Sequence, residues 1–212
     1  MAAARMHSVA APDPENRTLL LPVLPLDDVC LLPAASLTLV LDRPASVTAV
    51  QLATRTGDRL LALARREHDG APRELHAVGT VAEIRTVQAL SPLERRVELE
   101  GLSRARVSLL LGTDVLVAEA VPLEEGDAGD EWGAAVEALA RYLHAHSDLR
   151  SFLEAQPRSA DTMSWVNLAC QHLPITSSAR QKLLESNAQE RCLKISRGLD
   201  ALLKKEWASH SS

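Results

Sequence analysis

Two periods of apolar residues follow one another along this chain. Up to about residue 123, short runs rich in Val, Leu and Thr are separated by turn residues, as in β-strands. The segment Arg96–Glu100 alternates charged and apolar side chains, which is typical of a half-buried antiparallel strand. The pattern predicts seven strands: Leu19–Leu26, Leu37–Leu41, Leu60–Ala64, Val78–Val87, Arg95–Glu100, Ala105–Leu111 and Val115–Val121.

One helix is expected among these strands. Pro44 suits a first helical position, because it has no N–H to leave unpaired there. Val47, Val50 and Ala53 then form one apolar stripe at helical spacing.

Beyond residue 131 the period is helical. Apolar residues recur at i, i+4, i+7 and i+11 from Trp132 to Leu143. Pro174 breaks the chain, and Ser177 is expected to cap the next helix. A spacing near 3.5 from Leu184 to Leu202 predicts one long helix packed along a bundle.

The expected fold class is therefore α+β: an N-terminal β-rich pseudo-barrel with one helix, followed by a C-terminal α-helical bundle. We predict a flexible tail over residues 1–17, the β-rich domain over 18–123 and the helical subdomain over 132–207. Residues 124–131 contain five acidic residues and two glycines, which indicates an acidic hinge.

Composition restricts the function classes. Only five residues are aromatic, so the core must be aliphatic, and a net charge of −5 provides no global attraction for nucleic acid or an acidic membrane surface. The apolar stretches Leu19–Leu26 and Val29–Leu41 are too short or too interrupted to cross a bilayer as helices. The N-terminus also has no apolar signal-peptide core. We expect a cytoplasmic protein.

The chain shows no motif for catalysis or for cofactor binding. The phosphate-binding patterns GxxxxGK[ST] and GxGxxG are absent, as are GxSxG, SxxK and HExxH. Cys30, Cys170 and Cys192 form no CxxC pair and are expected to be buried, reduced thiols. His144 and His146 would point about 200° apart on a helix and could not share a metal. The sequence therefore predicts a protein that is not an enzyme and needs no cofactor or metal.

Two surfaces are candidates for binding other proteins. The first is a pair of turns with apolar residues where polar ones are usual, represented by Pro33, Leu37, Leu90 and Leu93. An extended client polypeptide could also add a strand to an exposed sheet edge. Folding of these apolar side chains back onto the core is the alternative.

The second candidate surface is the basic end of the chain. Lys194, Arg197 and Lys204 would form a docking face for one specific acidic protein partner. An ordinary solvated helix face is the alternative, and basic residues without interleaved aromatics do not indicate nucleic acid.

Four segments resemble the N-terminal domain of Lon proteases. Leu21–Val29 resembles the family pattern L-P-x-x-P-L-R-[DN]-x-V, and Leu31–Pro33 resembles the turn that follows it. Val78–Ile84 is similar to V-G-T-V-A-x-I, and Val97–Arg106 is similar to V-x-V-E-G-x-x-R-[AV]-x. The helical half is similar over Leu173–Arg191, and the resemblance extends over about residues 18–206.

The resemblance implies a pseudo-barrel, a helical bundle and recognition of client polypeptides, with self-association also allowed. It suggests a stand-alone member without the family's ATPase and Ser–Lys peptidase. The primary hypothesis is a non-catalytic module that binds client proteins through apolar loops. The alternative is an adaptor or regulatory subunit that docks through its helical end.

Some residues depart from the family pattern or invite a local prediction. Asp27 stands where the family usually has Arg, and Ala34 stands where it often has Gly, so the turn at Ala34 is expected to avoid positive φ. Arg104 and Arg106 share a strand face and are expected to form structural salt bridges with Glu83 or Glu98 on the sheet. Further backbone irregularities, a bulge or a tight bend, are expected at Gly79 and Gly101.

Overall fold

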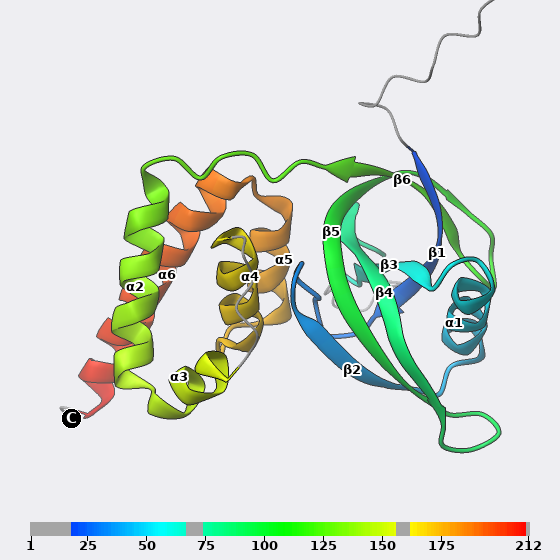
Figure 1. The fold of residues 1–212 in the computed structure, drawn as a ribbon, viewed down its shortest axis with the longest axis horizontal. Helices are drawn as coiled ribbons and strands as arrows, with labels where there is room; N and C mark the ends of the chain where they lie inside the picture. Colours follow the sequence, from blue (N-terminus) through cyan, green and yellow to red (C-terminus); the bar gives the residue numbers. More distant parts are fainter. Residues whose placement is uncertain (1–17, 67–73, 156–161, 211–212) are drawn as a thin grey trace, which may run out of the picture.

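The computed structural model describes residues 18–66, 74–155 and 162–210. Within these ranges the chain forms a β half and a helical half that lie side by side (Figure 1). The α+β class expected from the two apolar periods is confirmed. The tail predicted for residues 1–17 lies outside the described residues.

The elements of the β half match the predicted strands and helix closely. They are β1 (Leu19–Leu26), β2 (Ser36–Leu41), α1 (Pro44–Arg55), β3 (Arg59–Ala64), β4 (Val78–Ala89), β5 (Arg95–Leu111) and β6 (Val117–Leu123).

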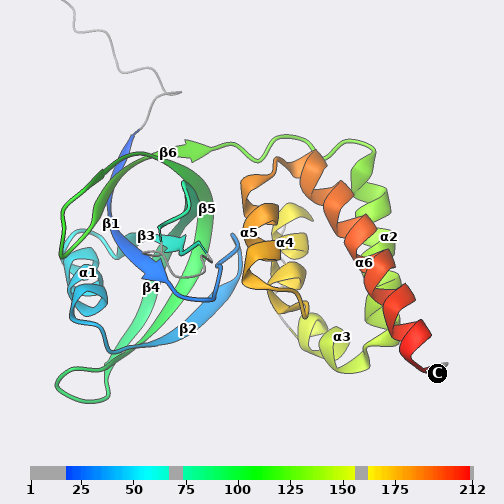
Figure 2. The same ribbon diagram turned by 180° about the vertical axis from the view of Figure 1, so that it is seen from behind.

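The helical half contains five helices. They are α2 (Glu131–Ala145), α3 (Ser147–Glu154), α4 (Thr162–His172), α5 (Ser177–Glu185) and α6 (Ala188–His210). Helices α2 and α6 run alongside each other at the far side, and α5 faces the sheet (Figures 1 and 2). No helix among the described residues combines the length and the apolar character that a membrane span requires.

Closure of the sheet depends on the length of β5. The strand order is β2-β5-β4-β3-β1-β6, and β6 pairs with β5 as well, so five strands form a ring with β2 attached outside it. The first half of β5, Arg95–Glu100, pairs with β2, and its second half, Arg104–Leu111, pairs with β6. The prediction of two separate strands here was wrong, because the chain bends between the halves without leaving the sheet.

Gly101 lies at this bend. The β4–β5 register shifts there, since Val81 is opposite Ser103 while Ala82 is opposite Gly101. A Cβ on Gly101 would lie 2.4 Å from the Leu32 carbonyl oxygen, so only glycine fits. The bulge expected at this glycine is confirmed.

Two details of the helices differ from the prediction. Thr176, not Ser177, caps α5, because its hydroxyl oxygen accepts a hydrogen bond from the Ala179 N–H at 3.1 Å. The helix predicted from Leu184 is broken before Ala188. The Asn187 side chain accepts a hydrogen bond from the Glu190 N–H at 2.8 Å and so starts a new helix, α6.

Three aliphatic clusters form the core. Successive residues of the strands alternate between two clusters on opposite faces, as Leu24 and Leu60 on one side and Val23 and Leu61 on the other illustrate. Helix α1 packs on the first cluster. The third cluster fills the helical half and continues into the β half through Cys30, Leu32, Ala64 and Val78.

The turn after Pro33 has a backbone conformation that differs from the prediction. Ala34 has φ +63°, in the left-handed region, where the prediction required a negative φ. The Ala34 N–H donates to the Gly101 carbonyl oxygen at 2.8 Å, and Ala35 is fully buried. Packing and this hydrogen bond therefore hold a non-glycine residue in a costly backbone conformation.

Candidate functional site

The tip of the β4–β5 hairpin presents two leucines to solvent. Leu93 is 72% exposed and Leu90 41% exposed. Figure 1 shows this hairpin projecting from the end of the sheet away from the helical half. Both side chains were predicted to form part of a binding surface, and the structure brings these two together.

Hydrogen bonds within the turn hold this tip in shape. The Ser91 hydroxyl oxygen accepts from the N–H groups of Leu93 and Glu94 at 3.3 and 3.1 Å. The Arg95 guanidinium donates to the Ser91 carbonyl oxygen at 2.7 Å. The polar groups are thus used inside the turn, and the leucine side chains are left pointing outward.

Pro33 and Leu37 do not join the leucines of the hairpin tip. Pro33 is buried, and Leu37 is half-buried against the aliphatic cluster on the α1 side. Leu37 pairs with Leu99, whereas the hairpin tip begins beyond Arg95. At about 3.3 Å per residue the two sites are roughly 13 Å apart along β5. Pro33 instead folds back onto the core, which was the alternative interpretation of this apolar turn.

The helical end carries the three predicted basic residues on one side of α6. Lys194, Arg197 and Lys204 are all exposed. Steps of three and ten residues leave them within about 80° of each other around the helix axis. The Lys194 ammonium donates to the Ser186 hydroxyl at 2.5 Å, which fixes it beside the α5–α6 junction.

An apolar groove of about 350 Å³ lies beside this basic face, between α5 and α6. Of the residues that line it, Ile195, Leu199 and Leu202 were predicted to pack along a bundle, and the groove itself was not predicted. The spacing near 3.5 in α6 shows that the helix has an apolar stripe. It does not show whether a neighbouring helix covers that stripe. The groove is lined by Leu173, Ile175, Ala179, Lys182, Leu183, Lys194, Ile195, Gly198, Leu199 and Leu202.

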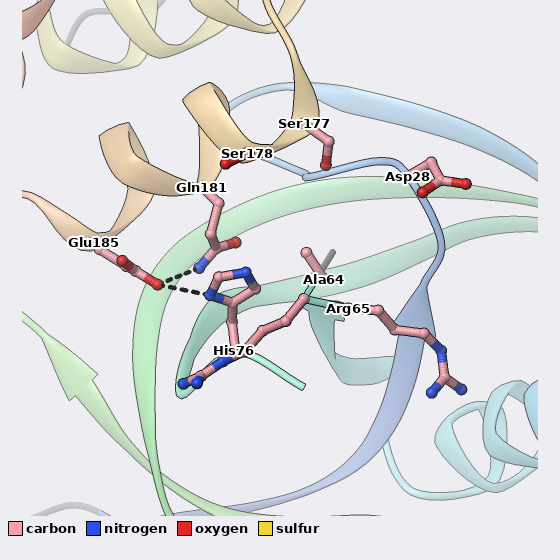
Figure 3. Close-up of a pocket in the computed structure, with 9 residues that line it drawn as sticks. Asp28, Ala64, Arg65, His76, Ser177, Ser178, Gln181 and Glu185 are labelled. Carbon is pink, nitrogen blue, oxygen red and sulfur yellow. Dashed lines mark hydrogen bonds and ion pairs between the residues drawn. The ribbon is translucent and has the colours of Figure 1, made fainter. Parts of the chain in front are cut away.

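A second cavity, of about 390 Å³, lies between the two halves and is polar (Figure 3). The Glu185 carboxylate lines it, 3.0 Å from His76 Nδ1 and 2.9 Å from Gln181 Nε2. Gln181 also donates to the Val78 carbonyl oxygen at 2.9 Å. These groups satisfy one another across the seam between β4 and α5, which indicates a structural contact.

The deepest polar contacts of the seam belong to two arginines. Arg104 is 3% exposed, and it donates to Glu125, to the Ser186 carbonyl oxygen at 2.6 Å and to the Glu124 carbonyl oxygen at 2.8 Å. The Arg104 partners predicted on the sheet, Glu83 and Glu98, were wrong. Its side chain points out of the ring toward the helical half, where the last turn of α5 offers free carbonyl groups.

Arg191 is fully buried beside Arg104. Glu125 bridges the two, with Oε1 3.0 Å from Arg104 Nε and Oε2 3.0 Å from Arg191 Nη1. Burial lowers the pKa of the Arg191 guanidinium, and the charge of Glu125 opposes this shift. One residue of the predicted acidic hinge thus pairs with an arginine of β5 and an arginine of α6 at once and offsets part of their charge.

The cysteines have the environment that was predicted. Cys30, Cys170 and Cys192 are all buried and reduced. Burial raises the pKa of Cys30 and of Cys170 to about 12, so both thiols are protonated near neutral pH and unsuited to nucleophilic attack. Within the described ranges, no group of three or more His, Cys, Asp or Glu side chains could hold a metal ion.

The architecture, a closed sheet followed by a helical bundle, is shared with solved N-terminal domains of Lon proteases. The N-terminal domain of the Mycobacterium avium complex Lon protease superposes with a TM-score of 0.67 at 20% identity, over 86% of this chain and 98% of that one. A Lon N-terminal domain protein from Xanthomonas campestris gives a TM-score of 0.59 at 25% identity, over 83% and 95%.

Sequence comparison identifies the family directly. The profile of the ATP-dependent protease La (LON) substrate-binding domain matches residues 20–200, and the chain belongs to this family. The Lon protease of Haemophilus influenzae is 30% identical over 84% of this chain, and Lon protease 1 of Thermus thermophilus is 34% identical over 82%. The chain spans about 23% of the length of these two relatives.

Proposed function

We propose that this chain binds client polypeptides through the apolar tip of the β4–β5 hairpin and performs no chemistry of its own. The exposure of Leu90 and Leu93 on a turn braced by Ser91 carries the proposal. A braced turn loses little entropy when a client covers it, so the burial of two leucines contributes to binding. Membership of the substrate-binding family supports a polypeptide as the ligand.

Truncation of both leucines tests the proposal. Binding of a reduced, carboxymethylated unfolded protein is measured by fluorescence anisotropy for the wild type and for a Leu90→Ala, Leu93→Ala variant. We expect the affinity to fall tenfold or more, because burial of one leucine side chain contributes about 1.5–3 kcal/mol. The melting temperature should remain nearly unchanged, since both side chains are solvent-exposed.

A matched control is available at the other end of β5. Leu109 and Leu111 are also exposed, at 45% and 46%, and their replacement by Ala should leave client binding intact. Equal losses in both double variants would contradict a specific site at the hairpin tip. A collapse in stability of the Leu90, Leu93 variant would show that these side chains belong to the core.

The α5–α6 groove favours a second function, an adaptor that docks on one protein partner. Lys182 and Lys194 border the apolar lining, and Arg197 and Lys204 continue the positive charge along α6. This combination suits an amphipathic partner helix with apolar residues on one side and acidic residues beside them. The −5 net charge of the whole chain makes this positive face a local feature.

Charge reversal separates the second function from the first. Lys194→Glu, Arg197→Glu and Lys204→Glu together should abolish the salt-sensitive capture of a single stoichiometric partner and leave unfolded-client binding unchanged. The control reverses Arg55, Arg59 and Arg106, three exposed arginines of the β half. If the control variant loses the partner equally, net charge and not the groove determines docking.

A further inference from the structure

Strand β2 has one paired edge and one open edge. Its six residues pair antiparallel with Arg95–Glu100 of β5. Among the residues that the structure describes, no strand pairs with its opposite edge. Figure 1 shows β2 at the rim of the β half, on the side that faces the helices. We call this opposite edge the free edge of β2.

The direction of the backbone groups follows from one hydrogen bond at the start of the strand. The Gly101 N–H donates to the Ala35 carbonyl oxygen at 2.9 Å. In an antiparallel ladder the residues that bond to the partner strand alternate with residues that do not. Leu37 and Leu39 therefore bond to β5, and the N–H and C=O groups of Thr38 and Val40 point away from β5, along the free edge.

A second unpaired edge in this sheet, on β4, is protected against the addition of another strand. Beyond Ile84, whose N–H donates to the Asp58 carbonyl oxygen at 2.8 Å, strand β4 has no partner strand on its β3 side among the described residues. There its register shifts between Ile84 and Thr86, and Arg85 forms ion pairs with Glu83 and Glu100. A bulge and a charged side chain are the usual means by which proteins prevent another strand from adding to an edge.

The free edge of β2 has neither device. Its sequence is Ser-Leu-Thr-Leu-Val-Leu, without a charged residue, a proline or a glycine, and its pairing with β5 shows no register shift. Ser36, Thr38 and Val40 are exposed, and Val40 is 56% exposed. Among the described residues, no charged side chain of β2, bulge or partner strand thus blocks this edge.

We infer that the free edge of β2 binds an extended segment of a client polypeptide as an added strand, backbone to backbone. An extended chain is the occupant that fits, because donors and acceptors repeat here at every second residue, which no helix can match. Such pairing does not depend on the client's side chains, as a protein that accepts many unfolded segments requires.

The position of the edge connects it to the hairpin tip. Val40 is opposite Arg96, three residues after Leu93. An added strand that continues past Val40 therefore runs toward Leu90 and Leu93. This inference rests on the proposed function: the hairpin leucines would bind apolar side chains of a client whose backbone pairs with β2.

Amide exchange in the 212-residue chain tests the inference residue by residue. In the free protein, the amides of Leu37 and Leu39 should exchange slowly and those of Thr38 and Val40 fast. Saturation with a reduced, carboxymethylated unfolded protein should slow exchange at Thr38 and Val40 by about tenfold or more. The absence of any binding to the wild type would overturn the proposed function, and the inference with it.

Two other outcomes would overturn the inference and leave the proposed function intact. The first is client binding with unchanged exchange at Thr38 and Val40. The second is slow exchange at these amides before any client is added, together with a dimeric mass by light scattering. That result would make a second copy of this chain the occupant of the edge.

A proline variant provides an independent test. Thr38→Pro removes an outward N–H without breaking a bond to β5, and proline is tolerated on edge strands. Client affinity should fall about tenfold, while Thr38→Val, which keeps the N–H, should bind like the wild type. Equal affinity of a folded Thr38→Pro variant and the wild type would contradict strand addition.

Discussion

The interior of the β half and the seam between the two halves are built from different chemistry. The strands bury Leu, Val, Ile and Ala on both faces, and the two clusters that they form contain no charged residue. The seam adds polar chemistry to the apolar contacts of the third cluster. It buries two arginines, Arg104 and Arg191, with Glu125 between them and with Gln181 bonded to the β4 backbone.

The two kinds of chemistry make different contributions to the fold. Aliphatic packing is non-directional, so it stabilises the sheet but does not fix how a second unit is oriented against it. Charged hydrogen bonds have strict geometry, and a buried guanidinium without its partners is costly. We therefore expect the apolar clusters to provide most of the stability and the arginine pair to fix the orientation of the helical half.

Removing the carboxylate of Glu125 should have the largest effect. Glu125→Gln leaves Arg104 and Arg191 without their shared negative charge, and loss of one partner of a buried ion pair typically costs about 3–5 kcal/mol. Urea denaturation measures this loss. Glu124→Gln is the control, because its side chain is exposed and only its carbonyl oxygen contacts Arg104. Equal stability of the two variants would show that the seam does not depend on the carboxylate.

A cavity in the aliphatic cluster should have a somewhat smaller effect. Leu99→Ala removes a fully buried side chain, and we expect a loss of about 3 kcal/mol in the free energy of unfolding. Leu102→Ala on the same strand, where the leucine is exposed, should cost less than about 0.5 kcal/mol. Thermal and urea unfolding should report both changes in one cooperative transition. A split transition for Leu99→Ala would mean that the halves unfold independently, against the role assigned to the seam.

The smallest expected effect is a gain. Ala34→Gly relieves a positive φ of 63°, and the relief, less the extra chain entropy of glycine in the unfolded state, should stabilise the protein by about 1 kcal/mol. A small increase in the urea midpoint at unchanged slope would confirm it. Ala35→Gly is the contrasting variant: Ala35 is buried and has no positive φ, so this change should destabilise. A loss of stability in Ala34→Gly would show that the Ala34 methyl group contributes packing that outweighs the backbone strain.

The candidate surfaces were predicted unevenly. Leu90 and Leu93 could be identified because apolar residues between two strands of a hairpin have no nearby core to cover them. Pro33 occurs in an equally apolar turn, but that turn lies against Gly101 and the helical half, so its apolar residues are buried. The groove beside Lys194 was not predicted, because the sequence pattern of an apolar helix stripe is the same whether or not another helix covers the stripe.

The sequence alone determined the α+β class, the positions of the strands, the helix at Pro44 and the family, since these depend on local period, turn residues and short motifs. Local patterns did not show that β5 is one strand or that Arg104 turns away from the sheet to meet Glu125 and Arg191. Nor did they show that one edge of β2 has no partner strand among the described residues. The difference between the two groups of features is the sequence separation of the residues that determine them. Local periodicity fixes which face of an element is buried, whereas a buried charge or an unpaired edge is defined by residues far away in the chain.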